Sequence, residues 1–176
     1  MTEVRRVCQI TRLLPEKREE YLELHGLYDR FADAGFSQAK VKGGRVAADD
    51  IRRLRIARDV MRRNSEEPAV MFDANESWHR SQAVRHIRRL EEAVDLTWVE
   101  EPLRRWDAVG LADLRGSIGA GVASGENLTG LEQYRPLLDA DAQPAALGAL
   151  LGEVELRRGC DEAHQAHLGG DGHPGS

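Results

Sequence analysis

Short apolar and β-branched runs alternate along this 176-residue chain with longer segments of helical pattern. The short runs predict five strands, at residues 6–13, 36–42, 69–74, 96–101 and 121–126. The longer segments predict five helices, at residues 15–34, 47–63, 80–94, 107–115 and 130–138. Such alternation is typical of repeated βα units, which form a parallel sheet with right-handed crossovers. The pattern therefore predicts an α/β protein of about five βα units.

Local signals indicate where some of these helices begin and where the pattern ends. Pro15 suits a first helical turn, and Thr129 with Glu132 has the spacing of a capping box. The segment 142–176 is rich in Gly, His and acidic residues and has no aromatic residue. We expect a short helix over 145–157 and then a disordered tail.

The number of βα units limits the architecture. A (β/α)8 barrel normally needs about 250 residues, and five units are too few to close one. We therefore expect a partial (β/α)8-type barrel that lacks the last strands. An incomplete barrel leaves open sheet edges, which can pair with a second copy in a homo-oligomer or with another chain.

Composition and charge exclude several classes of partner. The chain is 41% hydrophobic and 31% charged, and its net charge of -5 argues against nucleic acid as the main partner. No apolar run approaches the roughly 20 residues that span a bilayer. The first residues lack the apolar core of a signal peptide, so we expect a cytoplasmic protein. Arginine pairs such as Arg52 with Arg53 and Arg88 with Arg89 lie among acids on predicted helices, and we expect them to face solvent.

Polar side chains follow the carboxyl ends of four successive predicted strands, where parallel α/β barrels place their active sites. They are Lys40 and Lys42, Asp73 and Asn75, Glu100 and Glu101, and Glu126. Residues two apart on a strand share a face, so Lys40 and Lys42 are expected to point the same way, as are Asp73 and Asn75.

Three of these carboxylates could converge on one space. Asp73, Glu100 and Glu126 are separated by 27 and 26 residues, about one βα unit each. Converging anions repel unless a cation lies between them, and hard oxygen ligands favour Mg²⁺. Each carboxylate also has a structural alternative, as a turn or cap residue, an exposed residue before Pro102, or a residue before a capped helix.

The two lysines are unusual in this chain. Of 25 basic residues only three are lysine, Lys17, Lys40 and Lys42. Arginine stays protonated in proteins, whereas lysine can lose its proton, so two lysines at one strand end indicate a role that arginine cannot fill. The alternative is a solvated strand end.

Four motifs together resemble one family. KVK, FDAN followed by Trp78, WVEEP and SGEN occur in the order and spacing of the mandelate racemase branch of the enolase superfamily, over about residues 27–141. The resemblance implies Asp73, Glu100 and Glu126 as Mg²⁺ ligands, Lys42 as the base, Lys40 as its partner near the substrate carboxylate, and Asn75 beside the substrate. Within that branch, the segments DANESW and GENLTGLEQYRPLL look most like acid-sugar dehydratases.

This resemblance implies a chemistry as well as a site. The base removes the proton α to a carboxylate, the cation stabilises the enediolate, and loss of water completes an acid-sugar dehydratase reaction. A lysine base must be neutral, so its pKa has to fall from about 10.4 toward neutral pH. Racemisation or cycloisomerisation is the alternative outcome, and a catalytically inactive metal-binding fragment is the alternative class.

Parts of the family pattern have no match in the sequence. The Asp-His dyad of later strands is missing, because Asp161, His164 and His167 of the tail have no strand context, and we expect no N-terminal capping domain. Residues 5–25 instead resemble the start of the L-rhamnose mutarotase family, in which Tyr21 and His25 would belong to a sugar site. The alternative, which we favour, is that these two residues form one partly buried helical face. The predicted organisation is thus residues 1–26, 27–141 and 142–176.

Overall fold

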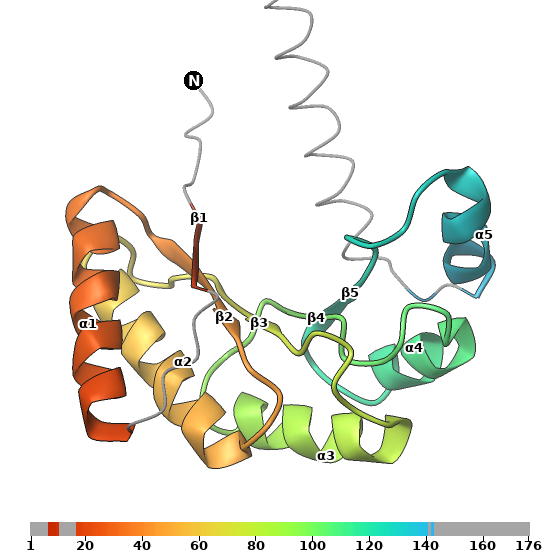
Figure 1. Cartoon of the computed structure of the whole chain (residues 1–176), viewed down its shortest axis with the longest axis horizontal. Coiled ribbons are helices and arrows are strands. Elements are labelled where there is room, and N and C mark those ends of the chain that lie inside the picture. The colour runs from red at the N-terminus through yellow and green to blue at the C-terminus, as the bar shows by residue number, and fades with distance from the viewer. Residues whose placement is uncertain (1–6, 11–16, 141, 143–176) are drawn as a thin grey trace, which may run out of the picture.

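One parallel sheet organises the computed structural model, which describes residues 7–10, 17–140 and 142. Its strands lie in chain order and are β1 (Val7–Ile10), β2 (Gln38–Lys42), β3 (Val70–Asp73), β4 (Trp98–Glu100) and β5 (Gly121–Ala123). The helices between them are α1 (Lys17–Asp33), α2 (Ala47–Met61), α3 (Arg80–Glu91), α4 (Ala108–Arg115) and α5 (Leu131–Asp139). Figure 1 shows the helices in an arc around the sheet, from α1 on the left through α3 to α4 and α5 on the right. The prediction of a partial (β/α)8-type barrel of five βα units is confirmed.

The core lies between this arc of helices and one face of the sheet. Along β2, β4 and β5, buried residues alternate with half-buried ones. The buried positions, such as Val41, Val99 and Val122, belong to the same apolar cluster as Leu54 of α2 and Ile87 of α3. Because side chains alternate along a strand, the half-buried positions face the other side of the sheet. The polar strand ends predicted to form a site lie on that side.

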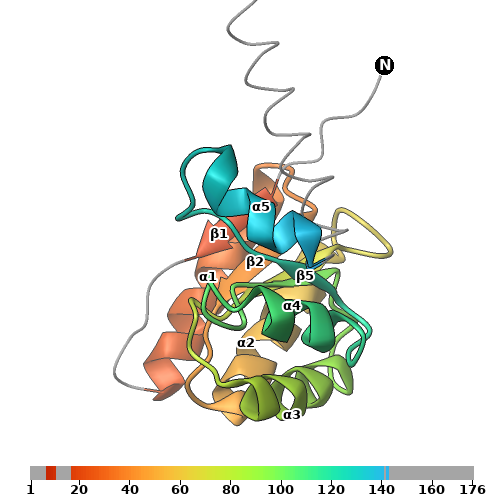
Figure 2. The same cartoon turned by 90° about the vertical axis from the view of Figure 1, so that its right-hand side faces the viewer.

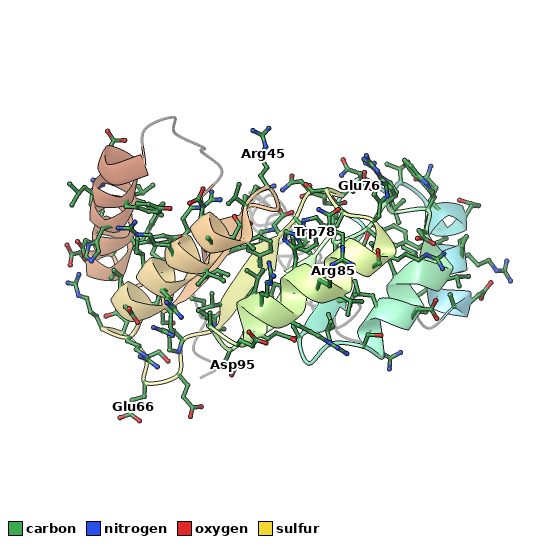
Figure 3. All side chains as sticks on the ribbon, turned by 90° about the horizontal axis from the view of Figure 1, so that it is seen from below. Arg45, Glu66, Glu76, Trp78, Arg85 and Asp95 are labelled. Carbon is green, nitrogen blue, oxygen red and sulfur yellow. The ribbon has the colours of Figure 1, made fainter. Side chains whose placement is uncertain are left out.

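Helices α4 and α5 lie on the β5 side of the described sheet. Contacts join α4 to both β5 and α5, and Figure 2 shows these two helices on the side of the molecule where β5 lies. The loops that follow the strands gather at one end of the sheet. Figure 3 shows Arg45 and Glu76, which follow β2 and β3, at that end, whereas Glu66 and Asp95, which precede β3 and β4, lie at the other.

One predicted helix end was wrong. The N-cap of α5 is Gly130, with no side-chain capping bond, and not Thr129. Instead, the side-chain oxygen of Gln133 accepts a hydrogen bond of 2.8 Å from the backbone N–H of Thr129. A side chain inside the helix thus reaches back to the residue before the cap, one position away from the predicted capping box.

Several predictions fall outside the described residues. These are the start of the first helix at Pro15, the helix over 145–157, and the tail with Asp161, His164 and His167. In the part of the chain that the structure describes, no helix is long and apolar enough to cross a membrane.

Candidate active site

The carboxylates of Asp73 and Glu100 lie side by side because their strands are in register. Asp73 pairs with Glu100 across β3 and β4, and Lys42 pairs with Asp73 across β2 and β3. In parallel strands, residues paired in this way point to the same face. The sheet therefore brings these three side chains together at the carboxyl ends of three neighbouring strands.

Two lysine ammonium groups lie against these carboxylates. Lys42 Nζ is 2.8 Å from Asp73 Oδ2, and Lys40 Nζ is 3.9 Å from the same oxygen. Lys40 Nζ also forms a close ion pair with Glu100 Oε2. The Asp73 side chain is fully buried, whereas the two lysine side chains are 18% and 13% exposed. A buried carboxylate is costly without a positive partner, and the two lysines supply one.

The two oxygens of Asp73 have different surroundings. Oδ1 accepts hydrogen bonds from the backbone N–H of Asn75 at 3.0 Å and from its side-chain amide at 2.8 Å. Oδ2 is buried, and its contacts are with the ammonium groups of Lys42 and Lys40. Asn75 has a φ of 47°, in the left-handed region that asparagine tolerates, and its side-chain oxygen accepts a 3.3 Å bond from Lys42 Nζ. Asn75 therefore fixes one oxygen of Asp73 and leaves the other directed at cations.

The charges around Lys42 decide its protonation. Burial lowers the pKa of Lys42, but Asp73, Glu126 and Glu100 together raise it by more, so that its pKa lies above its ordinary value of 10.5. Lys42 is therefore protonated in this arrangement. A neutral lysine requires that the negative charge of these carboxylates be balanced by a further cation.

Glu126 is the one predicted site residue that the structure does not bring into this cluster. It is exposed and lies three residues beyond the end of β5, on a loop where Gly125 has a φ of 131°. It acts on Lys42 through charge alone. Among the described residues, no group of three His, Cys, Asp or Glu side chains is close enough to hold a metal ion. Strand pairing thus places Asp73 and Glu100 side by side, whereas Glu126 lies on the loop after β5.

A buried ion pair behind β2 was missed from the sequence. Asp50 and Arg53 of α2 are 0% and 6% exposed, so the expectation that Arg53 faces solvent was wrong. Arg53 Nη1 donates to the backbone oxygen of Lys42 at 3.3 Å, and Asp50 accepts from the N–H of Gly44 at 3.1 Å. Trp78 Nε1 adds a 2.7 Å bond to the carbonyl of Gly44. The turn that follows Lys42 is therefore held by buried polar groups, and the only sequence signal was the i,i+3 spacing of Asp50 and Arg53.

Tyr21 and His25 have different environments. Tyr21 is 6% exposed, its hydroxyl donates to Asp49 at 3.1 Å, and the Arg52 guanidinium lies 4.0 Å from the centre of its ring. The His25 side chain is 55% exposed and pairs with Asp29 one helical turn away. The contacts of Tyr21 are those of packing between α1 and α2, and a role of the two residues in a sugar site stays a prediction.

Comparison with known proteins shows the family to which this chain belongs. Residues 23–166 match the family of enolase C-terminal domain-like proteins. The chain is 36% identical over 109 residues to the L-talarate/galactarate dehydratase of Salmonella typhimurium, an alignment that covers 61% of this chain and 26% of that protein.

Two crystal structures share the fold. One, of a racemase from Streptomyces coelicolor with bound magnesium, has a TM-score of 0.67 and 31% identity and covers 78% of this chain and 36% of that one. The other, of L-talarate dehydratase from Polaromonas sp. with Mg and L-glucarate, has a TM-score of 0.64 and 27% identity and covers 79% of this chain and 38% of that one. The chain thus spans about a quarter of the curated relative's length and just over a third of each solved chain. With most of its length matched, this protein belongs to the family of enolase C-terminal domain-like proteins.

Proposed function

We propose that this protein takes part in the Mg²⁺-dependent dehydration of a small sugar acid, which begins with abstraction of the proton α to a carboxylate. The observation that carries the proposal is the cluster of Lys40, Lys42, Asp73 and Glu100 at neighbouring strand ends. The similarity to two dehydratases supports the reaction class.

Asp73, Glu100 and Glu126 are the residues that would hold the cation. Their donors are carboxylate oxygens, which suit Mg²⁺. The buried Asp73 Oδ2, which faces the ammonium groups of Lys42 and Lys40, fits a position that binds positive charge. Solved relatives contain magnesium. When bound, the ion supplies positive charge that stabilises an enediolate.

The lysines carry the proton chemistry in this proposal. In its neutral form, which requires a further cation beside these carboxylates, Lys42 Nζ would take the α-proton as the carbon–hydrogen bond breaks, and the bonding electrons would move into the carboxylate to form the enediolate. Lys40 beside it keeps a positive charge near that carboxylate, and Asn75 contacts the substrate. Departure of the β-hydroxyl with a proton from a general acid gives an enol, which tautomerises to a 2-keto-3-deoxy acid. Return of a proton to the α-carbon would give racemisation instead, which the similarity to a racemase keeps as the second candidate.

Calorimetric titration with Mg²⁺ tests the cation site. We expect the wild-type protein to bind Mg²⁺ and Glu100→Gln to bind it roughly tenfold more weakly or worse, because one charged ligand is lost. Glu92→Gln is the matched control, since this exposed residue lies at the end of α3. Equal binding by wild type and Glu100→Gln would overturn the ligand assignment.

A screen of acid sugars for 2-keto-3-deoxy products, with Lys42→Ala as the inactive comparison, then separates a dehydratase from a metal-binding fragment.

A further inference from the structure

Glu101 is a buried carboxylate in an unusual backbone conformation, and it has no role in the proposed reaction. Its side chain follows Glu100 directly, is only 2% exposed and has a backbone φ of 43°. This left-handed conformation is unfavourable for a residue with a long side chain. A buried carboxylate with strained backbone, next to a candidate ligand, calls for a role of its own.

The backbone of Glu101 joins the loops that follow three strands. Its N–H donates to the carbonyl of Ala123, the last residue of β5, at 2.7 Å. Its own carbonyl accepts a 2.7 Å bond from the N–H of Glu76, in the loop after β3. Glu101 thus lies between the loops after β3 and β5 while it belongs to the loop after β4.

The side chain of Glu101 reaches the residue next to Glu126. The amide of Asn127 donates to both carboxylate oxygens of Glu101, at 3.1 and 3.5 Å. On the other side of Glu126, the carbonyl of Gly125 accepts a 2.9 Å bond from the hydroxyl of Tyr134 in α5. Glu126 therefore lies between two residues that are anchored from other elements.

We propose that Glu101 is a positioning residue, which holds the β5–α5 loop through Asn127 so that Glu126 can join Asp73 and Glu100 at the cation. This inference rests on the proposed function, because Glu126 needs a fixed position only if it is a ligand of the cation. Asp73 and Glu100 need no such device, since strand pairing places them. Glu126 lies on a loop and depends on its neighbours for its position.

Two measurements on purified variants of the 176-residue chain test this role. Glu101→Ala and Asn127→Ala should each weaken Mg²⁺ binding about tenfold, as loss of a group that orients a metal ligand does. Glu101→Gln keeps an oxygen that can accept from Asn127, so its affinity should stay within about threefold of the wild type. The double variant Glu101→Ala with Asn127→Ala should bind Mg²⁺ no more weakly than either single alanine variant, because each removes the same interaction.

In the metal-free protein, hydrogen exchange over residues 124–130 should be faster in Glu101→Ala than in the wild type.

Glu91 offers a matched control for a carboxylate that only stabilises a loop. Its Oε1 accepts from the backbone N–H groups of Gly119 and Ala120, at the opposite end of β5. Glu91→Ala should speed exchange in its own loop and leave Mg²⁺ affinity unchanged. Wild-type affinity in Glu101→Ala, or an equal loss in Glu91→Ala, would overturn the positioning role. If the wild type binds no Mg²⁺, the proposed function and the placement of a ligand fail together, and unchanged exchange in Glu101→Ala would overturn the loop anchoring separately.

Discussion

The two sides of the candidate site are built by different means. On the β2–β4 side, Lys42, Asp73 and Glu100 take their positions from the hydrogen-bonded register of parallel strands, and the face behind them is packed against helices. On the β5 side, Glu126 lies on an exposed loop whose shape depends on Gly125 and on bonds from other elements. Strand register therefore fixes the positions of the charged side chains on the first side, whereas the loop side needs separate anchors. Substitutions that act on one side only can test this difference.

Removing the packing behind β3 should have the largest effect. Phe72 precedes Asp73, is fully buried and stacks on Trp78 with ring centres 5.9 Å apart and planes within 9°. Phe72→Ala leaves a cavity in the core, and we expect the free energy of unfolding to fall by about 3–5 kcal/mol. Urea unfolding followed by circular dichroism measures the change. Leu131→Ala, at a side chain that is 82% exposed, is the control and should change stability very little. A loss below about 1 kcal/mol for Phe72→Ala would mean that packing does not hold this side of the site.

A substitution in the β5–α5 loop should have an intermediate effect. Gly125 has a φ of 131°, and a Cβ added there would lie 2.9 Å from Cε1 of Tyr134. We expect Gly125→Ala to lower the free energy of unfolding by about 2 kcal/mol, through backbone strain and the displaced ring.

Gly26 provides the same substitution in a permissive place. It lies inside α1, and nothing is within 4 Å of the position that its Cβ would take. Gly26→Ala should therefore raise stability by about 0.5–1 kcal/mol, because alanine favours a helix interior. If thermal unfolding shows the two alanine variants shifted in the same direction, the conformation of Gly125 is not the constraint that we describe.

The sequence pattern predicted the sheet-fixed side well and the loop side poorly. Alternation along β2 placed Lys40 and Lys42 on one face, and the spacing from Asp73 to Glu100 placed the two carboxylates on adjacent strands. These relations follow from the period of a strand and from the length of a βα unit. The burial of Arg53 did not follow, because its partner, the carbonyl of Lys42, is set by tertiary packing.

The hydrophobic and polar pattern did not predict the loop geometry, for a related reason. At the start of α5, Gly130 has a positive φ, and the backbone N–H of Thr129, before the cap, donates a hydrogen bond to the side chain of Gln133. A capping-box motif specifies residue types at a given spacing, but it does not specify the backbone conformation before the helix. The position of Glu126 also depends on the path of a loop. The spacing from Glu100 therefore predicted its place after the next strand, but not its distance from Asp73.

A small, pH-dependent effect is predicted for the bond between the loops after β3 and β4. The Glu76 carboxylate accepts hydrogen bonds from the backbone N–H and Nε of Arg105, at 2.8 and 2.7 Å. These bonds, with a further one from Arg104, hold the pKa of Glu76 below its ordinary value of 4.5. A lowered pKa in the folded state adds stability that is fully present above pH 4.5 and is lost as the pH falls through the lower, folded value.

At neutral pH, Glu76→Gln should therefore lower the free energy of unfolding by about 1 kcal/mol, and the difference from wild type should shrink below pH 4.5. Urea unfolding at both pH values measures it, with Glu66→Gln at the opposite end of the sheet as the control (Figure 3). A difference that stays constant with pH would show that the Glu76 charge does not stabilise the contact between the two loops, which would then depend on backbone bonds such as that from the N–H of Glu76 to the carbonyl of Glu101.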